Sequence, residues 1–201
     1  MKLYYSPGAC SLASHIVLEE LGLGYTTEAV NLATKKTRGG ADFSTINPKG
    51  YVPALQLDDG SVLTEGTAVL QYLADRKPAA GLAPPNGTPA RYRLQEWLGF
   101  INSEIHKNYS ALFNPSIPEA TKALFKQNLV RRLGFIERSL VGKRFLLGDQ
   151  FSVADAYLYT VLGWSGRFAI PLDEFPGVQA YRERIAARAS VKSAQAAEKP
   201  D

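Results

Sequence analysis

Cysteine is the scarcest reactive residue in this sequence: Cys10 stands alone among 201 residues, so no disulfide can form within the chain. A single thiol suits a reducing compartment, and we expect a cytoplasmic protein. Histidine occurs only as His15 and His106, and two histidines with one cysteine at this spacing predict no metal site. No apolar run approaches the ~20 residues that span a bilayer, and no signal-peptide pattern precedes the first predicted strand. A membrane partner is therefore not expected.

Strong charge of either sign is also lacking. The chain has 23 Lys and Arg against 19 Asp and Glu, a formal net charge of +4, and its basic residues are mostly dispersed. This balance lacks the strongly basic surface by which proteins bind nucleic acid, so no nucleic-acid partner is expected. A small positive excess acts most strongly when it is focused in a cleft, which favours small anionic ligands. The 45% hydrophobic content is enough for one large core or two smaller ones.

The stretch from Lys2 to Leu21 is where we place the chemistry. Its first residues, up to Tyr5, are rich in aromatics and predict a short strand, which the following Ser-Pro-Gly turn cluster ends. A helix follows, because apolar residues recur at spacings of three and four. Ser11 is its predicted N-cap. We therefore expect Cys10 at the N-terminus of a helix.

A thiol in that position is a candidate reactive group. The unpaired N–H groups and positive dipole end of a helix favour a thiolate over a thiol. The same N–H groups favour an anionic ligand, which includes the thiolate of a bound small molecule. The alternative is that Cys10 is a small buried hydrophobic residue without a chemical role.

The next segments predict the rest of an α/β domain. Residues 25–30 form a second strand, parallel to the first in a βαβ unit. Residues 31–46 are polar and predicted to be irregular, with at most a short helix; their lysines are either solvated or folded over the Cys10 end. Residues 51–57 and 61–63 predict a hairpin. Pro53 belongs at the start of its strand, which leaves the backbone of Val52 free to pair with a ligand.

A second helix is predicted to follow the hairpin. Thr64 is its expected N-cap, and Gly66 would expose backbone N–H groups to a ligand carboxylate. Glu65 either takes part in binding or only complements the helix dipole. The expected buried face of this helix consists of Ala68, Val69, Tyr72 and Leu73.

Six prolines and glycines within residues 77–89 predict a linker. Beyond it, helical periodicity runs through the segments 91–113, 118–140, 152–168 and 177–189. The first two are expected to bury Leu94, Leu98, Ile101, Ile105 and Leu112, and then Leu124, Leu129, Leu133 and Ile136. The predicted fold class is α/β plus all-α, with a first domain over residues 1–77, a linker over 78–89 and an all-helical domain over 90–201.

The helix predicted from residue 152 begins with a folding signal. Ser152 and Asp155 have the spacing of a capping box, and Phe151 is placed to act as a hydrophobic staple. We interpret Asp155 as a helix cap. The alternative is a general base.

The segment 91–113 carries a polar seam of Gly99, Ser103 and His106, at positions i, i+4 and i+7. His106 is a candidate proton carrier, because the ordinary pKa of histidine lies near neutrality. The alternatives are a plain solvent face or a close helix contact at Gly99.

Six motifs together resemble the glutathione S-transferases, and their details look like the bacterial beta class. They are YYSPGACSLASHI, NPKGYVPALQLDDGSVLTEG, QYLAD, RYRLQEWLGFINSEIHK, LFNP and GDQFSVADAYL. They follow the family's order and span nearly the whole chain. The resemblance implies a thioredoxin-like N-terminal domain, an all-helical C-terminal domain and a homodimer.

The resemblance also implies glutathione as co-substrate, without a metal. Cys10 would lie beside the glutathione sulfur, with Tyr5, Ser11 and His106 as further candidate donors. Val52, before a cis Pro53, would pair with the cysteinyl part. The implied glutathione-binding residues are Ala9, Cys10, Lys35, Tyr51, Val52, Pro53, Glu65, Gly66, Gly99, Ser103, Glu104, His106 and Lys107. Those implied for a hydrophobic second substrate are Tyr109, Phe113 and Trp164.

Two residues depart from the family pattern. The family usually has asparagine in place of Gly99 and serine in place of Gly66, so two side-chain hydrogen bonds to glutathione would be missing. Since each neutral hydrogen bond contributes ~0.5–1.5 kcal/mol, we expect a weaker affinity for glutathione rather than loss of binding.

Three functions fit these residues. The main hypothesis is a glutathione transferase that conjugates glutathione to hydrophobic electrophiles, as in detoxification. The first alternative is a thiol-disulfide or peroxide reductase that cycles through a mixed disulfide of Cys10 with glutathione. The second is a non-catalytic carrier of apolar compounds.

Overall fold

The computed structural model describes residues 1–199, which form two compact units. The first unit contains residues 1–80 together with those from 187 onward, and the second contains residues 81–186. This division differs from the predicted boundaries, which assign the whole C-terminal segment to the helical domain. The reason is that the last helix, α8 (Ala189–Ala197), packs on α1 (Leu12–Leu21) in the first unit.

A five-stranded sheet organises the first unit, in the order β3-β2-β1-β4-β5. The strands are β1 (Lys2–Tyr5), β2 (Thr26–Asn31), β3 (Lys36–Thr37), β4 (Ala54–Gln56) and β5 (Val62–Thr64). β1 and β2 are parallel and joined through α1, so the predicted βαβ unit is confirmed. β4 and β5 form the predicted antiparallel hairpin. The short β3 and a single 3-10 turn, η1 (Phe43–Thr45), occur where an irregular segment is predicted.

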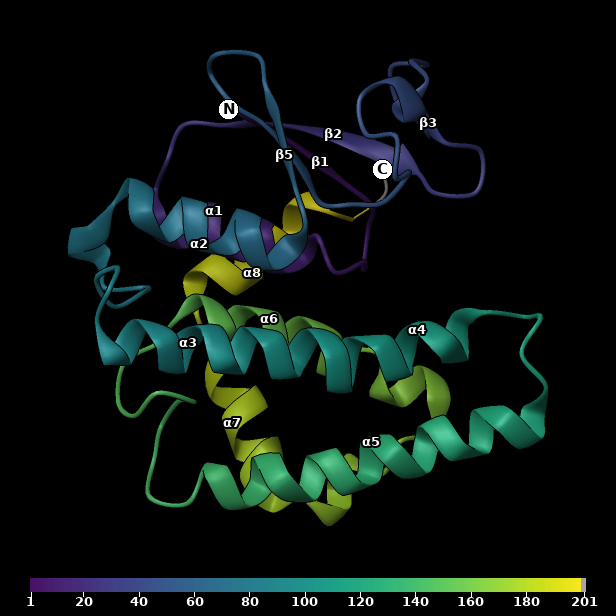
Figure 1. Cartoon of the computed structure of the whole chain (residues 1–201), viewed down its shortest axis with the longest axis vertical. Helices are drawn as coiled ribbons and strands as arrows, with labels where there is room; N and C mark the ends of the chain where they lie inside the picture. Colours follow the sequence, from purple (N-terminus) through teal and green to yellow (C-terminus); the bar gives the residue numbers. More distant parts are fainter. Residues whose placement is uncertain (200–201) are drawn as a thin grey trace. The chain divides into compact units, whose positions relative to one another are not determined.

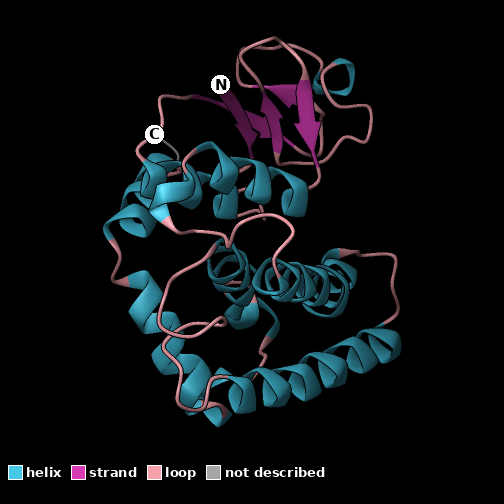
Figure 2. Ribbon diagram, turned by 60° about the vertical axis from the view of Figure 1, so that its left-hand side comes forward, coloured by secondary structure: helices cyan, strands magenta, loops and turns pink. Residues whose placement is uncertain are grey.

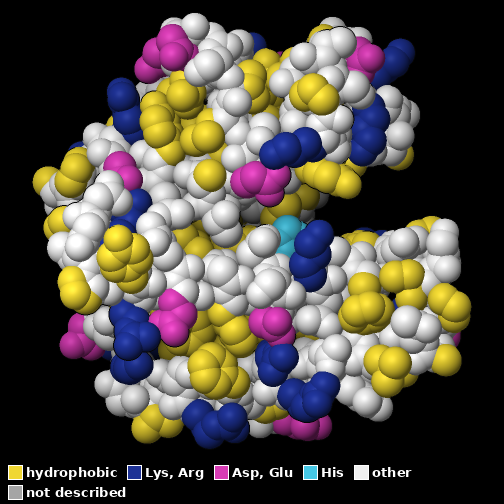
Figure 3. Space-filling model, viewed as in Figure 1, with side chains coloured by type: hydrophobic (Ala, Val, Ile, Leu, Met, Phe, Trp, Pro, Cys, Tyr) yellow, Lys and Arg dark blue, Asp and Glu magenta, His cyan; other side chains and the backbone are white. Residues whose placement is uncertain are grey.

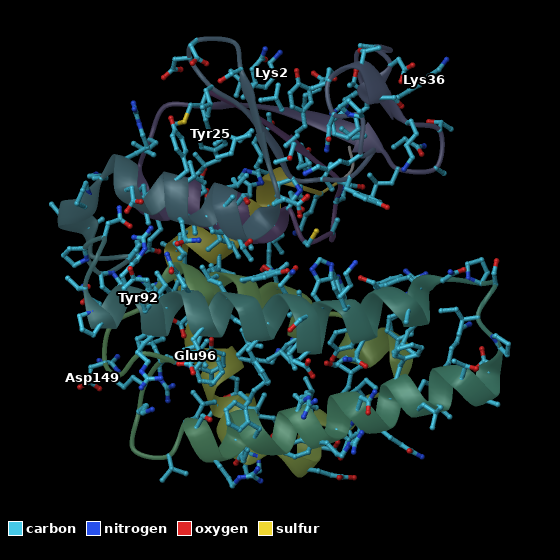
Figure 4. The ribbon with its side chains drawn as sticks, in the orientation of Figure 1. Lys2, Tyr25, Lys36, Tyr92, Glu96 and Asp149 are labelled. Carbon is cyan, nitrogen blue, oxygen red and sulfur yellow. The ribbon has the colours of Figure 1, made fainter. Side chains whose placement is uncertain are left out.

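The two faces of this sheet are covered differently. Figures 1 and 2 show α1 and α2 (Gly66–Arg76) lying along the same face. Because side chains alternate along a strand, Leu3 and Tyr5 point to one face of β1 and Tyr4 to the other. Tyr5 contacts the ring of His15 on α1, whereas Tyr4 packs with Phe43 in a cluster on the opposite face. Lys2 and Lys36 belong to strands of this layer (Figure 4).

The second unit is helical, as predicted. Its helices are α3 (Pro89–Phe100), α4 (Lys107–Phe113), α5 (Glu119–Ser139), α6 (Val153–Leu162) and α7 (Pro176–Ala186). The predicted helix over 91–113 contains a π-helical segment, Ile101–His106, between α3 and α4. Its predicted apolar face is buried throughout: Leu94, Leu98, Ile101, Ile105 and Leu112.

Several sequence predictions for the helices are corrected. Leu124 near the start of α5 is 59% exposed, so the buried face of that helix begins only at Leu129. The helix predicted over 152–168 ends at Leu162, because Gly163 follows and the chain tightens into a 3-10 turn, Ser165–Phe168. In α2, the fully buried residues include Leu70, while Ala68 and Tyr72 are only half-buried. The helix α8 was not predicted.

Asp155 is a buried folding device, as interpreted. The capping box with Ser152 is present, and the Asp155 carboxylate also accepts hydrogen bonds from the backbone N–H of Leu146 and the hydroxyl of Tyr181, both at 2.9 Å. Phe151 is buried against Phe145. These contacts join the loop before α6 to α7. Across residues 1–199, no helix combines the length and apolar character needed to cross a bilayer.

Candidate functional site

Cys10 lies in the turn between β1 and α1, at the predicted N-terminal end of the helix. Its Sγ atom is 3.1 Å from the carbonyl oxygen of Val52, to which the thiol donates a hydrogen bond. The backbone N–H groups of Cys10 and Ser11 face the sulfur. Two segments far apart in the sequence therefore meet at this thiol.

The charge state of Cys10 differs from the prediction. Burial raises the pKa of the thiol to about 11, from an ordinary value of 9.0. The two backbone N–H groups lower the pKa, but the desolvation of a charged sulfur outweighs them, and the carboxylates of Glu198 and Glu65 raise the pKa further. At neutral pH, Cys10 is thus a neutral thiol and a hydrogen-bond donor.

Ser11 and Tyr5 flank this turn in ways the sequence did not predict. Ser11 stands in the N-cap position of α1, but its side chain makes no capping bond to the helix. Its Oγ atom instead accepts from the backbone N–H of Ser6 at 3.2 Å. Tyr5 is 7% exposed, and its ring contacts His15 with 5.8 Å between ring centroids. The Ser11 side chain thus bonds within the turn, and the Tyr5 ring packs on α1.

The Val52–Pro53 bond is cis, as the resemblance implies, and β4 begins directly after it. Val52 is buried in the cluster that also holds Tyr4 and Phe43, and Ala9 packs against this cluster. Gly66, the first residue of α2, lies close by: a Cβ atom there would be 3.9 Å from the Pro53 ring. Ala9, Val52, Pro53 and Gly66 are therefore brought together near Cys10.

Lys35, which the resemblance implies as a glutathione-binding residue, donates a hydrogen bond to the backbone. Its Nζ atom donates to the carbonyl oxygen of Gly50 at 2.9 Å and lies 6.0 Å from the centre of the Tyr51 ring. Tyr51 is 68% exposed, and its carbonyl oxygen accepts from the Asn47 side chain. The loop before β4 thus presents one ammonium and one aromatic ring together.

Glu65 is exposed and adopts a left-handed backbone conformation, with φ of 68°. It occupies the N-cap position of α2, so the predicted cap Thr64 is wrong. Thr64 instead ends β5, and its hydroxyl accepts from Nζ of Lys49 at 3.0 Å. The same Nζ atom lies 2.6 Å from the Glu65 carboxylate.

In the second unit, the predicted polar seam is divided by the π-helical segment. Gly99 and Ser103 are exposed, and the Ser103 hydroxyl donates to the carbonyl oxygen of Gly99 at 3.0 Å. Glu104 turns toward α5, where its carboxylate pairs with Arg132 at 2.6 Å. Lys107 is exposed. The prediction assumes 3.6 residues per turn, and the wider π turn changes which residues share a face.

His106 is half-buried and held by a tyrosine. Its Nδ1 atom lies 2.6 Å from the hydroxyl of Tyr157, which donates its own proton to Oδ1 of Asn102 at 3.0 Å. Nδ1 then carries the imidazole proton and Nε2 is the acceptor. Burial, followed by the charge of Lys107, lowers the pKa of His106 to about 4. The predicted proton carrier with a near-neutral pKa is therefore wrong.

The three residues that the resemblance implies for a second substrate form one aromatic cluster: Tyr109, Phe113 and Trp164. Trp164 contacts both of the others edge-on, with ring centroids 5.8 Å from Tyr109 and 5.4 Å from Phe113. Tyr109 is fully buried and its hydroxyl lies 2.5 Å from that of Ser165, so Tyr109 supports the cluster from inside. Phe113 is 41% exposed. In Figure 3, hydrophobic side chains gather over the end of α4 and the start of α5.

Two sets of residues near these sites were missed. In the first unit, Glu198 accepts from the backbone N–H of Gly8 at 3.2 Å and lies 3.0 Å from Nδ1 of the buried His15. No local pattern links residues so distant in the sequence. In the second unit, Phe168 and Arg167 join the aromatic cluster. The available signal is the aromatic residues after Gly163, which the helical periodicity assigns to one helix over 152–168.

The described residues 1–199 contain no group of three or more His, Cys, Asp or Glu side chains arranged to hold a metal ion. Cys10 is a free thiol. The chemistry available in the first unit is therefore hydrogen bonding by a neutral thiol and backbone N–H groups. The second unit offers a neutral imidazole and an aromatic surface.

Comparisons with known proteins agree with this arrangement. The model of the glutathione S-transferase N-terminal domain matches residues 8–76, and that of the C-terminal domain matches residues 100–189. The chain is 43% identical over 198 residues to glutathione S-transferase GstA of Escherichia coli O157:H7, with 98% of each chain covered.

Two solved structures extend these matches. A sphingomonad glutathione S-transferase complexed with glutathione is 46% identical, with a TM-score of 0.95. The bacterial beta class glutathione S-transferase of Sphingomonas chungbukensis is 47% identical, with a TM-score of 0.96. Both alignments cover 98% of either chain. The predicted fold is confirmed, and the chain belongs to the glutathione S-transferase family.

Proposed function

We propose that this protein is a glutathione transferase that conjugates glutathione to hydrophobic electrophiles. The observation that carries the proposal is the meeting of the Cys10 thiol with the carbonyl group of Val52, at 3.1 Å, beside Pro53 and the first turn of α2. A thiol-bearing tripeptide that pairs its cysteinyl backbone with Val52 brings its own sulfur next to Cys10. The sphingomonad relative complexed with glutathione supports glutathione as the co-substrate.

The protein must favour the thiolate of glutathione, since a free thiol with a pKa of ~8.5 is mostly protonated at neutral pH. In this proposal, the neutral Cys10 thiol and the N–H groups at the start of α1 donate hydrogen bonds to the glutathione sulfur. The glutathione proton leaves to solvent. A thiol has one proton, so Cys10 gives up its bond to Val52 in order to donate to the glutathione sulfur, and the Val52 carbonyl oxygen then accepts the ligand N–H.

The thiolate then attacks an electrophilic carbon of the second substrate. For an aryl chloride, a carbon–sulfur bond forms and chloride departs with its electron pair. We assign the binding of this substrate to Phe113 and Trp164, with Tyr109 as their buried support. Among the other glutathione-binding residues that the resemblance implies, we assign Lys35 to the glycine carboxylate, and Glu65 and Gly66 to the γ-glutamyl end.

A neutral Cys10 favours conjugation over the reductase alternative. A disulfide exchange that begins with attack by Cys10 needs a thiolate at that residue. Burial raises the pKa of this thiol to about 11, so the thiolate fraction at neutral pH is small. Conjugation in which Cys10 only donates a hydrogen bond needs no thiolate at that residue.

Substitution of Cys10 separates the three functions. In Cys10→Ala, we expect conjugation of 1-chloro-2,4-dinitrobenzene to continue at a reduced rate, because the backbone N–H donors remain. Reduction of a mixed disulfide is expected to be slow both in the natural chain and in Cys10→Ala. Loss of disulfide reduction together with unchanged conjugation would favour the reductase. Glutathione binding without turnover of any aryl halide, epoxide, hydroperoxide or disulfide would favour the carrier.

The family resemblance further supports a homodimer that works in the cytoplasm. Sedimentation of the purified chain tests the dimer, which we expect at twice the 21.9 kDa mass of one chain. A single species of 21.9 kDa at micromolar concentration would contradict it.

A further inference from the structure

The aromatic cluster of the second unit carries a cation that the family resemblance did not point to. The guanidinium carbon of Arg167 lies 5.1 Å from the centre of the Phe113 ring and 6.0 Å from that of Phe168. Those two rings meet edge-on, with 4.7 Å between their centroids. Arg167 is thus stacked on the exposed part of the surface to which we assign the second substrate.

Arg167 has no carboxylate partner within residues 1–199. Two other arginines of this unit are paired with acidic side chains: Arg132 with Glu104 and Arg93 with Glu96. Stacking on an aromatic ring uses the flat face of a guanidinium and leaves its N–H groups, which point outward in the plane, available to an anion. A carboxylate fits two of these N–H groups at once.

The backbone holds this arginine in a defined position. The N–H of Arg167 donates to the carbonyl oxygen of Trp164 at 3.1 Å, and the N–H of Ile170 donates to that of Ser165 at 3.0 Å. The buried Tyr109 fixes the same turn through its contact with the Ser165 hydroxyl. The turn therefore holds Arg167 and the partly exposed ring of Trp164 on a fixed support, and Phe113 at the end of α4 contacts both.

We propose that Arg167 is a specificity-determining residue that selects aromatic electrophiles bearing an anionic group, such as a carboxylate. The ring of the substrate stacks against Phe113 and Trp164, and its carboxylate pairs with the guanidinium. This inference rests on the proposed function, since it concerns the second substrate of the conjugation. The inference adds to the proposed function a negative charge that the second substrate carries.

A matched pair of substrates tests the proposal: 4-chloro-3-nitrobenzoate and its uncharged methyl ester. Conjugation of both with glutathione is measured for the natural chain, for Arg167→Gln and for Arg167→Lys. We expect Arg167→Gln to lower kcat/KM for the carboxylate by about 10- to 100-fold through a higher KM, because a charge-assisted bidentate bond is lost. The ester should change less than about threefold, and Arg167→Lys should recover part of the loss.

Arg144 provides a matched control, since it stacks on Phe145 at 5.9 Å in the same unit without a place in the proposed site. Arg144→Gln should leave both substrates unchanged. Equal losses for the carboxylate and the ester in Arg167→Gln, or no loss for either, would overturn the proposal. Calorimetric titration of the full chain with 3-nitrobenzoate measures the same recognition without turnover. If the protein conjugates neither substrate but its binding of 3-nitrobenzoate weakens in Arg167→Gln, the anion site is retained and the transferase function is rejected. If the binding does not weaken, the anion site is rejected.

Discussion

The sulfur of Cys10 lies 3.1 Å from the carbonyl oxygen of Val52, the residue before the cis Pro53. A thiol that donates to a carbonyl group in a desolvated position is stabilised in its protonated form, since a thiolate would lose the bond and face the carbonyl dipole. The backbone N–H groups at the helix N-terminus lower the pKa of the thiol, but burial raises it by more. Burial therefore keeps the Cys10 thiol protonated at neutral pH, and the protonated thiol donates to Val52.

Alkylation of Cys10 is expected to be slow at neutral pH. Because the pKa is raised from 9.0 to about 11, the thiolate fraction near pH 7.5 falls by roughly a hundredfold. The initial rate with iodoacetamide should show this decrease relative to the chain unfolded in urea, and it should still rise above pH 10. The chain has one cysteine, so mass spectrometry reports this residue alone. A rate that levels off near pH 7 would show a thiolate at neutral pH and contradict the donor role.

A serine at position 66 is expected to tighten glutathione binding. The Cβ atom it adds meets the Pro53 ring at 3.9 Å, an ordinary contact, so the substitution fits the backbone. One neutral hydrogen bond adds ~0.5–1.5 kcal/mol, which corresponds to a Kd about 2- to 10-fold lower. Calorimetry of Gly66→Ser and Gly66→Ala separates the hydroxyl from the added carbon. If both variants bind alike, the serine hydroxyl makes no contact with glutathione.

His106 should make the fold sensitive to acid. Its pKa is lowered to about 4 by burial, and the unfolded chain has the ordinary value of 6.5. The unfolded state then binds a proton that the folded state does not, so stability is complete above pH 6.5 and falls as the pH drops toward 4. At about 1.36 kcal/mol per pKa unit, over the two units between pH 6.5 and pH 4.5, the loss is about 2.5 kcal/mol. The free energy of unfolding, measured with urea, falls between pH 7 and pH 4.5. This fall should be smaller in His106→Asn than in the natural chain by that amount. Identical differences in both chains would show that His106 titrates normally.

Asp155 should matter for stability and not for chemistry. Its carboxylate accepts from the backbone of Leu146, the backbone and hydroxyl of Ser152, and the hydroxyl of Tyr181. Asp155→Ala leaves buried donors unpaired and is expected to lower the free energy of unfolding by about 3–5 kcal/mol. Asp149→Ala, an exposed neighbour, should change it by less than about 0.5 kcal/mol. A loss of kcat in fully folded Asp155→Ala would restore the general-base alternative.

The elements that the sequence predicted correctly are those specified by local patterns. The turn after Tyr5, the hairpin around Asp59 and Gly60, and the capping box at Ser152 each depend on a few adjacent residues. The family motifs then assigned the order of the two halves. Together, these signals predict one site that contains Cys10, Val52 and Gly66.

The features that were missed depend on contacts between distant residues. The short helix Ala189–Ala197 has a weak apolar pattern and is held by α1, so its place in the first unit could not be derived from residues 187–199 alone. The π-helical segment before His106 accompanies its bond to Tyr157, 51 residues away. The raised pKa of Cys10 is the sum of burial by several segments. Helix position alone predicted the opposite direction.

The most direct test of the central claim is a crystal structure of the chain with glutathione bound. We expect the glutathione sulfur within hydrogen-bond distance of the Cys10 thiol, and the cysteinyl backbone of glutathione paired with the backbone of Val52. Glutathione bound elsewhere, or Cys10 still bonded to Val52 with no ligand sulfur beside it, would contradict the claim.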